Sequence, residues 1–256
     1  MTAHTSLFNY GFSTGALTDV GRKRKTNQDE TLVCQETGFF AVSDGMGGLR
    51  CGGKTSQMIQ QLLPDMIGKA SNGLTKESSP ELAAEILSEQ TRLLSDSIYN
   101  TGNQHNMFDY GATLSGVWLI GNHAIFVNIG DSRGYLLLRN NSDITQITMD
   151  HNEAARLVQE GKIEKNESIY RWASSYLTQF MGMDPPAMPE TFIKEVYSGD
   201  ILLLCSDGLH GMMDDSLFPS ILRSSENPQK ICENLVEKAN TLGGDDNIAV
   251  VYIKIE

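Results

Sequence analysis

Residues 113–139 read TLSGVWLIGNHAIFVNIGDSRGYLLLR, a stretch of apolar runs separated only by short turns. The runs cover residues 113–121, 124–130 and 134–139, and their β-branched and aromatic side chains are typical of strands. Parallel strands need a crossover of a dozen or more residues, whereas antiparallel strands need only a tight turn. The stretch therefore predicts antiparallel sheet.

Other apolar runs of strand length lie on both sides of this stretch. Residues 31–34 and 39–43 are separated by a loop of hairpin length. Further runs occur at residues 191–196, 201–206 and 248–255. The sequence thus predicts a mostly antiparallel β structure.

Helical patterns fall between these strand groups. Ser79-Pro80 supplies a cap and a first-turn proline, and apolar side chains then recur every three or four positions up to residue 98. Asn227-Pro228 begins a second helix. A third helix is expected from residue 55 to about residue 66.

The segment 151–190 differs from the rest of the chain. It is polar, weakly periodic and ends in Pro185-Pro186, so we expect a surface insertion rather than part of a sheet. A short helix over residues 152–161 is the regular element predicted within it.

The composition bounds the class of protein. The chain has 256 residues, of which 40% are hydrophobic, enough for a substantial core. Its formal net charge of −12 argues against binding to nucleic acid or to anionic membranes, because both surfaces would repel it. No apolar run has the length of a membrane-spanning helix, and the first residues, MTAHTSLFNYGFS, do not have the pattern of a secretory signal.

The cysteines indicate a reducing compartment. There are 4 of them, Cys34, Cys51, Cys205 and Cys232, scattered without a C-x-x-C pair. Reduced thiols in a cytosolic protein are the simplest interpretation. We therefore expect a cytoplasmic protein. No repeat or Pro/Gly/Ser-rich linker divides the chain, so residues 1–256 are expected to form one domain. The protein is expected to be a monomer.

Residues 48–55, GLRCGGKT, satisfy the pattern G-x-x-x-x-G-K-[ST] of a loop that cradles nucleotide phosphates. Such a loop leaves its strand directly and opens a helix in a parallel βαβ unit. Here Gly45-Met46-Gly47 separate the octet from the strand that ends at Asp44, and the hairpins are the wrong architecture. The sequence argues against nucleotide hydrolysis through Lys54 and Thr55, which stays the least favoured alternative.

Aspartates recur where the predicted strands begin or end, often beside glycine. They are Asp29, Asp44, Asp131, Asp207 and Asp246. One such residue is explained by turn chemistry, since Asp and Gly end strands routinely. Five together, without a matching set of Lys or Arg nearby, must be solvated, paired or metal-bound. Hard oxygen ligands at one rim suit Mg²⁺ or Mn²⁺ rather than zinc.

The chain resembles the metal-dependent protein phosphatases, the type 2C serine/threonine phosphatases, and is most similar to their bacterial single-domain branch. The resemblance runs from about residue 13 to the C-terminus. It is carried by motifs that occur in the family's order: DVGRKRKTNQDE (19–30), AVSDGMGG (41–48), YGATL (110–114), NIGDSRGYLL (128–137), LTQFMG (177–182), LLCSDGL (203–209) and GGDDNIAVV (243–251).

The resemblance implies an α+β fold. Two antiparallel β-sheets would pack face to face, with helices outside them in a four-layer αββα sandwich. Metal ions would lie in a cleft at one end, and the insertion at 151–190 would form a flap beside that cleft.

The resemblance also implies a set of metal ligands for Mn²⁺ or Mg²⁺. Asp44 would bridge two ions, the carbonyl of Gly45 would bind one of them, and Asp207 and Asp246 would bind the other. Asp29 matches the acidic residue that orders metal-bound water. Asp131, together with Asp207, matches a third metal site of bacterial relatives.

The implied reaction is hydrolysis of phosphoserine and phosphothreonine in proteins. A hydroxide activated by the two ions would attack phosphorus in line, without a covalent phospho-enzyme. Arg24 matches the arginine that grips the substrate phosphate through its bidentate fork. The implied partners are phosphorylated proteins and a companion serine/threonine kinase.

Some positions depart from the family's pattern. Met46 stands where animal relatives carry a histidine proposed as the general acid. Many bacterial relatives also have Met here, so the resemblance implies that metal-bound water protonates the leaving group. His151 and His210 are conceivable acids, although packing or surface roles are favoured for both. Gln28 replaces a glutamate of many relatives. The flap segment 170–175, YRWASS, lacks the usual His-Pro-x-x-Asn pattern, and residues 49–53 lack the usual His and Glu.

An active phosphatase is therefore the expected function. The alternative from another class is a binding module with an inactive phosphatase fold. That alternative predicts lost ligands, and the presence of Asp44, Asp207 and Asp246 argues against it.

Overall fold

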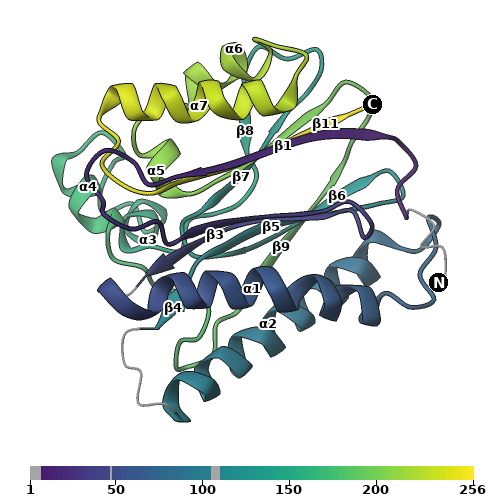
Figure 1. The fold of residues 1–256 in the computed structure, drawn as a ribbon, viewed down its shortest axis with the longest axis horizontal. Helices are drawn as coiled ribbons and strands as arrows, with labels where there is room; N and C mark the ends of the chain where they lie inside the picture. Colours follow the sequence, from purple (N-terminus) through teal and green to yellow (C-terminus); the bar gives the residue numbers. More distant parts are fainter. Residues whose placement is uncertain (1–6, 47, 105–109) are drawn as a thin grey trace.

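Two antiparallel sheets lie face to face and carry helices on their outer faces (Figure 1). The computed structural model describes residues 7–46, 48–104 and 110–256, without the side chains of residues 48–51 and 103. Every ladder between the named strands is antiparallel. The expected four-layer αββα sandwich is confirmed, and the first quoted stretch contributes strands to both sheets.

The 6-stranded sheet has the order β2-β3-β5-β6-β9, with β4 paired to β3. Its strands are β2 (Asp29–Cys34), β3 (Phe39–Met46), β4 (Gly111–Ala112), β5 (Leu114–Ile120), β6 (His123–Ile129) and β9 (Glu190–Glu195). The 5-stranded sheet has the order β1-β11-β10-β7-β8. Its strands are β1 (Phe12–Asp19), β7 (Arg133–Leu137), β8 (Thr145–Gln146), β10 (Ile201–Cys205) and β11 (Ile248–Ile255).

Helices cover both outer faces. Helices α1 (Gly48–Ala70) and α2 (Pro80–Gln104) lie on the 6-stranded sheet, and α7 (Pro228–Leu242) lies on the 5-stranded sheet (Figure 1). The shorter helices are α3 (Glu153–Gln159), α4 (Ser168–Ser174), α5 (Asp207–His210), η1 (Asp215–Leu217) and α6 (Phe218–Leu222). No described helix combines the length and the apolar character needed to cross a bilayer.

Strand β5 shows why the sequences of the central strands are continuous apolar runs. Val117 and Leu119 belong to the core between the two sheets, whereas Trp118 and Ile120 belong to the core under α1 and α2. Successive side chains of a strand point to opposite faces, so a strand covered on both sides needs apolar residues at every position. All of β5 is accordingly buried.

The capping residues place the helices where the sequence predicts them. Asn227 accepts hydrogen bonds from the backbone N–H groups of Gln229 and Lys230 at the start of α7. Ser79 Oγ accepts one from Leu82 N–H at the start of α2. In the insertion, Asn152 accepts from Ala155 N–H and starts α3. These three predicted helices are confirmed, with ends shifted by a few residues.

The octet 48–55 forms the first turns of α1, so the helix begins at Gly48 and not at residue 55. It also runs past Pro64 to Ala70 rather than ending near residue 66. The strand before it, β3, lies in an antiparallel sheet. These residues therefore do not form a nucleotide-binding loop, and that alternative is wrong for this fold.

The glycines of the octet serve the packing of α1 against β3. A Cβ on Gly52 would come within 2.5 Å of the Gly45 carbonyl oxygen and 2.6 Å of the Met46 carbonyl oxygen. A Cβ on Gly45 would meet the Gly52 backbone at 2.4 Å. Only two facing glycines allow this approach, which brings the end of β3 directly against the start of α1.

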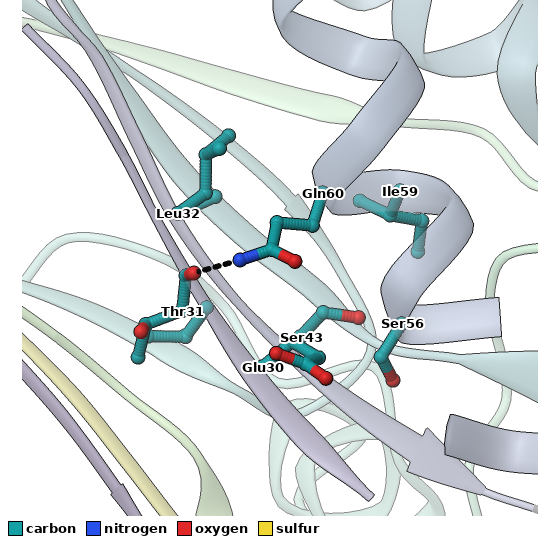
Figure 2. A pocket seen from close by; sticks show the side chains of 9 residues that line it. Glu30, Thr31, Leu32, Ser43, Ser56, Ile59 and Gln60 are labelled. Carbon is teal, nitrogen blue, oxygen red and sulfur yellow. Dashed lines mark hydrogen bonds between the residues drawn. The ribbon is translucent and has the colours of Figure 1, made fainter. Parts of the chain in front are cut away.

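A small crevice lies where α1 packs on the edge strand β2 (Figure 2). Gln60 reaches across it and donates a hydrogen bond of 2.8 Å from Nε2 to the Thr31 carbonyl oxygen. The crevice has a volume of about 10 Å³, which is enough for one water molecule at most. The crevice is therefore a feature of helix packing and not a ligand site.

Strand β1 was not expected from the sequence. Residues 12–19 are mostly half-buried and lack an apolar run, and the strand forms because it pairs along its length with β11. The two-residue strands β4 and β8 and the short helices α4, α5 and α6 are likewise set by distant neighbours. Cys34, Cys205 and Cys232 are free thiols, and the side chain of Cys51 lies outside the described part.

The close approach of Gly52 predicts a large difference between neighbouring substitutions. Gly52→Ala should lower the free energy of unfolding by about 1–3 kcal/mol, because the backbone of β3 must move. Gly53→Ala is the control, since its nearest neighbour is the Gln28 Cα at 3.7 Å. That variant should be neutral or up to about 1 kcal/mol more stable. Urea unfolding of both variants measures this difference. An equal loss of unfolding free energy in the two variants would contradict the packing explanation.

Candidate active site

Four of the predicted aspartates meet at one end of the sandwich, at the left of Figure 1. They lie at the end of β3, after β6, after β10 and before β11, so both sheets contribute. They line a cleft of about 480 Å³. The predicted site residues that line it are Arg24, Asp44, Gly45, Asp131, Asp207 and Asp246. Asp29 is only 3% exposed and lies in β2, beside Asp44.

Asp29 and Asp44 stand directly opposite each other in the β2–β3 ladder. Cross-strand neighbours have Cβ atoms about 5 Å apart, where like charges destabilise a sheet. Burial raises the pKa of Asp29 to about 7, with Asp207 and Asp246 adding to the shift, although Ser206 Oγ donates a 2.6 Å hydrogen bond to its Oδ2. Burial, followed by the charge of Asp29, also raises the pKa of Asp44. The pair therefore lacks compensating positive charge.

Asp207 brings a third carboxylate to the same place from the other sheet. It follows β10 as the first residue of α5. Burial and the charges of Asp44 and Asp131 raise its pKa, and its carboxyl lies in hydrogen-bonding contact with that of Asp44. Asp29 Oδ1 and Asp207 Oδ1 are both buried without a hydrogen-bond partner among the described residues. Two orphaned carboxylate oxygens at the base of an open cleft fit an oxygen-binding cation.

The carboxylates do not yet form a closed cage. Within the described part of the chain, no three His, Cys, Asp or Glu side chains are grouped closely enough to surround a metal ion. Asp44 contacts both Asp29 and Asp207, a cluster of like charges that a cation would stabilise. The donor chemistry fits a hard divalent cation.

Arg24 lines the cleft and pairs with Asp246. Its Nη2 donates a 2.7 Å hydrogen bond to Asp246 Oδ2, and its side chain is 55% exposed. Lys23 makes a similar contact with Asp245 at 2.6 Å. An exposed ion pair contributes only about 0–1 kcal/mol, so Arg24 can leave Asp246 for a ligand phosphate at little cost.

Asn247 fixes the loop that carries Arg24. Its Nδ2 donates to the carbonyl oxygens of Val20 and Thr26, and its Oδ1 accepts from Gln28 N–H at 2.9 Å. These bonds tie both ends of the loop to the residue that follows Asp246. The side chain is 6% exposed. Asn247 is therefore a positioning residue for one wall of the cleft.

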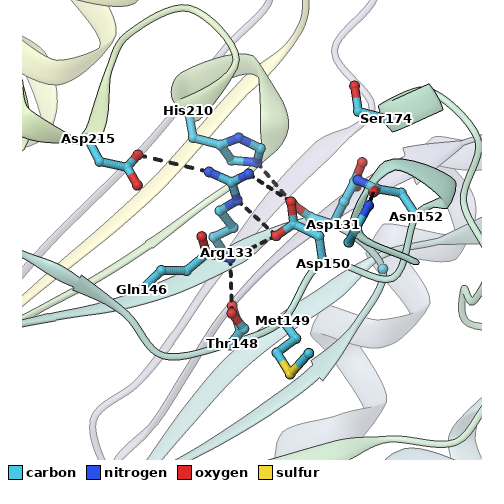
Figure 3. Close-up of polar contacts among 12 residues, drawn as sticks. Asp131, Arg133, Gln146, Thr148, Met149, Asp150, Asn152, Ser174, His210 and Asp215 are labelled. Atoms are coloured by element: carbon cyan, nitrogen blue, oxygen red, sulfur yellow. Dashed lines mark hydrogen bonds and ion pairs between the residues drawn. The ribbon is translucent and has the colours of Figure 1, made fainter. Parts of the chain in front are cut away.

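Asp131 lies at the foot of the flap, the insertion of residues 151–190 (Figure 3). Burial and then the charge of Asp150 raise its pKa to about 7. The Asn152 side chain, which caps α3, hydrogen-bonds its carboxyl. His210 Nε2 lies 3.0 Å from its carbonyl oxygen. The base of the flap and the site are thus one hydrogen-bonded unit.

A buried ion pair anchors this unit to β7. Arg133 forms two parallel hydrogen bonds with Asp150, of 2.9 Å from Nε and 2.7 Å from Nη2 (Figure 3). The side chains are 13% and 6% exposed, and Gln146 donates a further bond to Asp150. Breaking a buried pair by removing one partner typically costs about 3–5 kcal/mol. The clamp therefore fixes where the flap begins.

Neither histidine considered as a proton donor lines the cleft. Loss of hydration and then the charge of Arg133 lower the pKa of His210 to about 3, so this imidazole is neutral near pH 7. His151 is 6% exposed, and its Nδ1 accepts a hydrogen bond from Gly130 N–H. Both are structural residues. Met46 and Gln28 do line the cleft.

Three polar residues of the site were missed by reasoning from the sequence. Ser206 supports Asp29, Asn247 orders the Arg24 loop, and Thr113 Oγ1 accepts a 3.0 Å hydrogen bond from Asp44 N–H. Each lies next to a predicted strand or next to a predicted aspartate. Their positions in the sequence could have marked them as site residues. Their hydrogen-bond partners could not be predicted, because these come from distant segments of the chain.

Comparison with known proteins identifies the family. A family model described as protein phosphatase 2C matches residues 21–238. The serine/threonine phosphatase stp of Listeria welshimeri is 30% identical over 240 residues, which cover 93% of each chain. The chain belongs to the protein phosphatase 2C family, and the resemblance inferred from its motifs is confirmed.

Solved structures agree with this assignment. The serine/threonine phosphatase PstP/Ppp of Mycobacterium tuberculosis superposes with a TM-score of 0.80 at 28% identity, over 96% of this chain and 99% of that one. The catalytic domain of a phosphatase PstP, solved in complex with two manganese ions, gives a TM-score of 0.77 at 27% identity, over 95% and 98%. The chain is accordingly a protein serine/threonine phosphatase, and so a hydrolase.

The role of Asn247 predicts a measurable loss of stability. Asn247→Ala removes three hydrogen bonds to backbone groups of the Arg24 loop, and should lower the free energy of unfolding by about 2–3 kcal/mol. Asn234→Ala is the matched control, because this half-buried side chain donates a hydrogen bond to the Ser224 hydroxyl and makes no other hydrogen bond to a described residue. That change should stay within about 0.5 kcal/mol. If urea unfolding gives the same result for both, Asn247 does not hold the loop.

Proposed function

We propose that this phosphatase hydrolyses phosphoserine and phosphothreonine in proteins with the help of two divalent cations, Mn²⁺ or Mg²⁺. The observation that carries the proposal is the gathering of uncompensated carboxylates around an open cleft, with buried oxygens of Asp29 and Asp207 left without partners among the described residues. Such a site is unfavourable without positive charge and favourable with it.

The residues proposed as ligands of the two ions are Asp44, the carbonyl of Gly45, Asp207 and Asp246. Asp29 lies beside Asp44 and orients the water of the site, and Asp131 is the ligand of a third ion. When bound, such cations lower the pKa of water to near neutrality and withdraw charge from phosphoryl oxygens. The third ion and the choice between Mn²⁺ and Mg²⁺ are part of the proposal.

The remaining work falls to the protein's own groups. Arg24 exchanges Asp246 for the phosphate, because a guanidinium binds two phosphate oxygens at once and is permanently charged. Thr113 holds the backbone of Asp44 through hydrogen bonds with its hydroxyl and amide groups. The described lining of the cleft contains no histidine and no cysteine. The proposed mechanism is direct attack of water on phosphorus, without a covalent phospho-enzyme.

A binding module with an inactive phosphatase fold is the alternative function. It predicts a cleft that has lost its acidic residues, whereas all the predicted ligands are present and all except Asp29 line the cleft. We therefore keep the active enzyme as the proposed function. Residues 1–256 would form one catalytic domain acting as a monomer on phosphorylated proteins, in company with a serine/threonine kinase.

Activity should depend on divalent cations and on the aspartates. The purified protein should hydrolyse p-nitrophenyl phosphate with Mn²⁺ or Mg²⁺ and lose the activity in excess chelator. Asp44→Asn and Asp207→Asn should reduce kcat by a factor of about 10² or more, because each removes charge that holds the cations. Mn²⁺ should raise the Tm of the unmodified protein and not that of Asp44→Asn.

Lys54→Ala is the control for this experiment, because Lys54 is exposed on α1 and does not line the cleft. It should keep its activity. Full activity in chelator, or an unchanged Tm with Mn²⁺, would refute the metal-dependent mechanism.

Arg24 should act mainly on substrate binding. Arg24→Ala, assayed at saturating Mn²⁺, should raise KM about 10- to 100-fold, the value of a hydrogen bond to a charged group. Arg24→Lys should recover part of the loss. Arg22→Ala removes the same charge from the same loop but outside the cleft lining, and should leave KM nearly unchanged. A normal KM in Arg24→Ala would remove its assigned role.

A further inference from the structure

The flap presents an exposed pair of aromatic side chains. Trp172 is 59% exposed and Tyr176 is 51% exposed. Their ring centroids lie 4.7 Å apart with an interplanar angle of 56°, so they form one continuous apolar surface. Ile169, on the same helix α4, is 43% exposed. Isolated exposed apolar residues are ordinary, but a paired cluster of large ones indicates a contact surface.

This aromatic pair borders the cleft. Tyr176 stands between Ser175 and Leu177, and both of these residues line the cleft. On the other side, Arg171 precedes Trp172 and lies 3.8 Å from Asp245, which is next to the cleft residue Asp246. Trp172 lies on α4 and Tyr176 follows its end, so the aromatic pair sits on a stretch of the flap whose neighbouring residues contact the cleft.

Basic side chains accompany the aspartates in the lining of the cleft. Lys23, Arg24 and Lys25 line the cleft, although the chain carries a net charge of −12. Lys25 is exposed and forms no ion pair within the described ranges, while Lys23 and Arg24 each have an acidic partner. The basic mouth, lined by Lys23, Arg24 and Lys25, therefore attracts anionic segments of a substrate through the unpaired Lys25.

We propose that the Trp172–Tyr176 pair binds an apolar side chain within two residues of the phosphorylated residue, in an acidic, extended segment of the substrate. This inference rests on the proposed function and adds the preferred substrate sequence. An extended chain advances about 3.3 Å per residue, so a neighbour one or two positions away lies about 3–7 Å along the chain from the phosphorylated residue. The basic mouth then faces the acidic residues of the segment.

The test compares acidic phosphothreonine peptides that differ at one position. Phe is placed, in separate peptides, one or two residues before or after the phosphothreonine, and the matched peptide has Ala at all of these positions. We expect a KM about tenfold lower for at least one Phe peptide than for the Ala peptide, with similar kcat. Trp172→Ala and Tyr176→Ala should remove most of this difference while leaving hydrolysis of p-nitrophenyl phosphate unchanged.

Tyr197→Ala is the matched control. Tyr197 is an exposed tyrosine, 43% accessible, and precedes β10 at the end opposite to Asp207. It should retain the full preference for the Phe peptide. An equal loss of preference in Tyr197→Ala would contradict the proposal.

Fluorescence gives a readout that does not depend on turnover. The chain has 2 tryptophans, and Trp118 is fully buried, so changes in solvent exposure report on Trp172. A Phe peptide in which CH₂ replaces the bridging ester oxygen should shift the emission to the blue and protect it from acrylamide quenching. Trp172→Phe should abolish both effects, whereas the Ala peptide should produce smaller ones.

The outcomes separate the two hypotheses. Loss of p-nitrophenyl phosphate hydrolysis would refute the proposed function alone, and the fluorescence titration would still test the peptide contact. Normal hydrolysis of that ester with no distinction between the Phe and Ala peptides would refute this inference alone. Sedimentation showing that Trp172→Ala disrupts a dimer would assign the surface to a second copy of the chain and overturn the proposal.

Discussion

Repulsion between carboxylates at one end of the sandwich is the constraint on which the rest of the structure depends. Asp29 and Asp44 face each other across a ladder, and Asp207 joins them from the second sheet. A fold selected for stability alone would not place them there, because each buried charge without a partner costs several kcal/mol. The surrounding structure holds them in place, and a bound cation would turn that cost into affinity.

Two features supply this support. The glycine contact between β3 and α1 fixes the end of the strand that carries Asp44. The hydrogen bonds of Asn247, together with the Ser206 hydroxyl, tie the residues around Asp246 and Asp29 to their neighbours. The glycine contact and the Asn247 bonds act on the backbone next to the carboxylates, and Ser206 holds the Asp29 carboxylate itself. Together they preserve the geometry of the site while the charges repel one another.

The flap is joined to the site by the same kind of interaction. The Arg133–Asp150 clamp and the Asn152 side chain anchor the flap's first residues next to Asp131. Its far part, α4, carries polar and aromatic residues beside the cleft mouth. The base of the flap is thus held together with the site, whereas its exposed outer part is where a protein substrate would make contact.

The sequence by itself determined the antiparallel sheets, the main helices and the identity of the acidic residues, because strand periodicity, caps and Asp-Gly junctions are local signals. Only the tertiary structure decided that Arg24 rests on Asp246, that His210 and His151 lie outside the cleft lining, and that β1 is a strand. The octet at 48–55 illustrates the difference, since its glycines match a nucleotide loop locally but pack a helix against a strand. Contacts between distant segments leave no periodic pattern in the chain, so they become visible only when the two sheets are packed together.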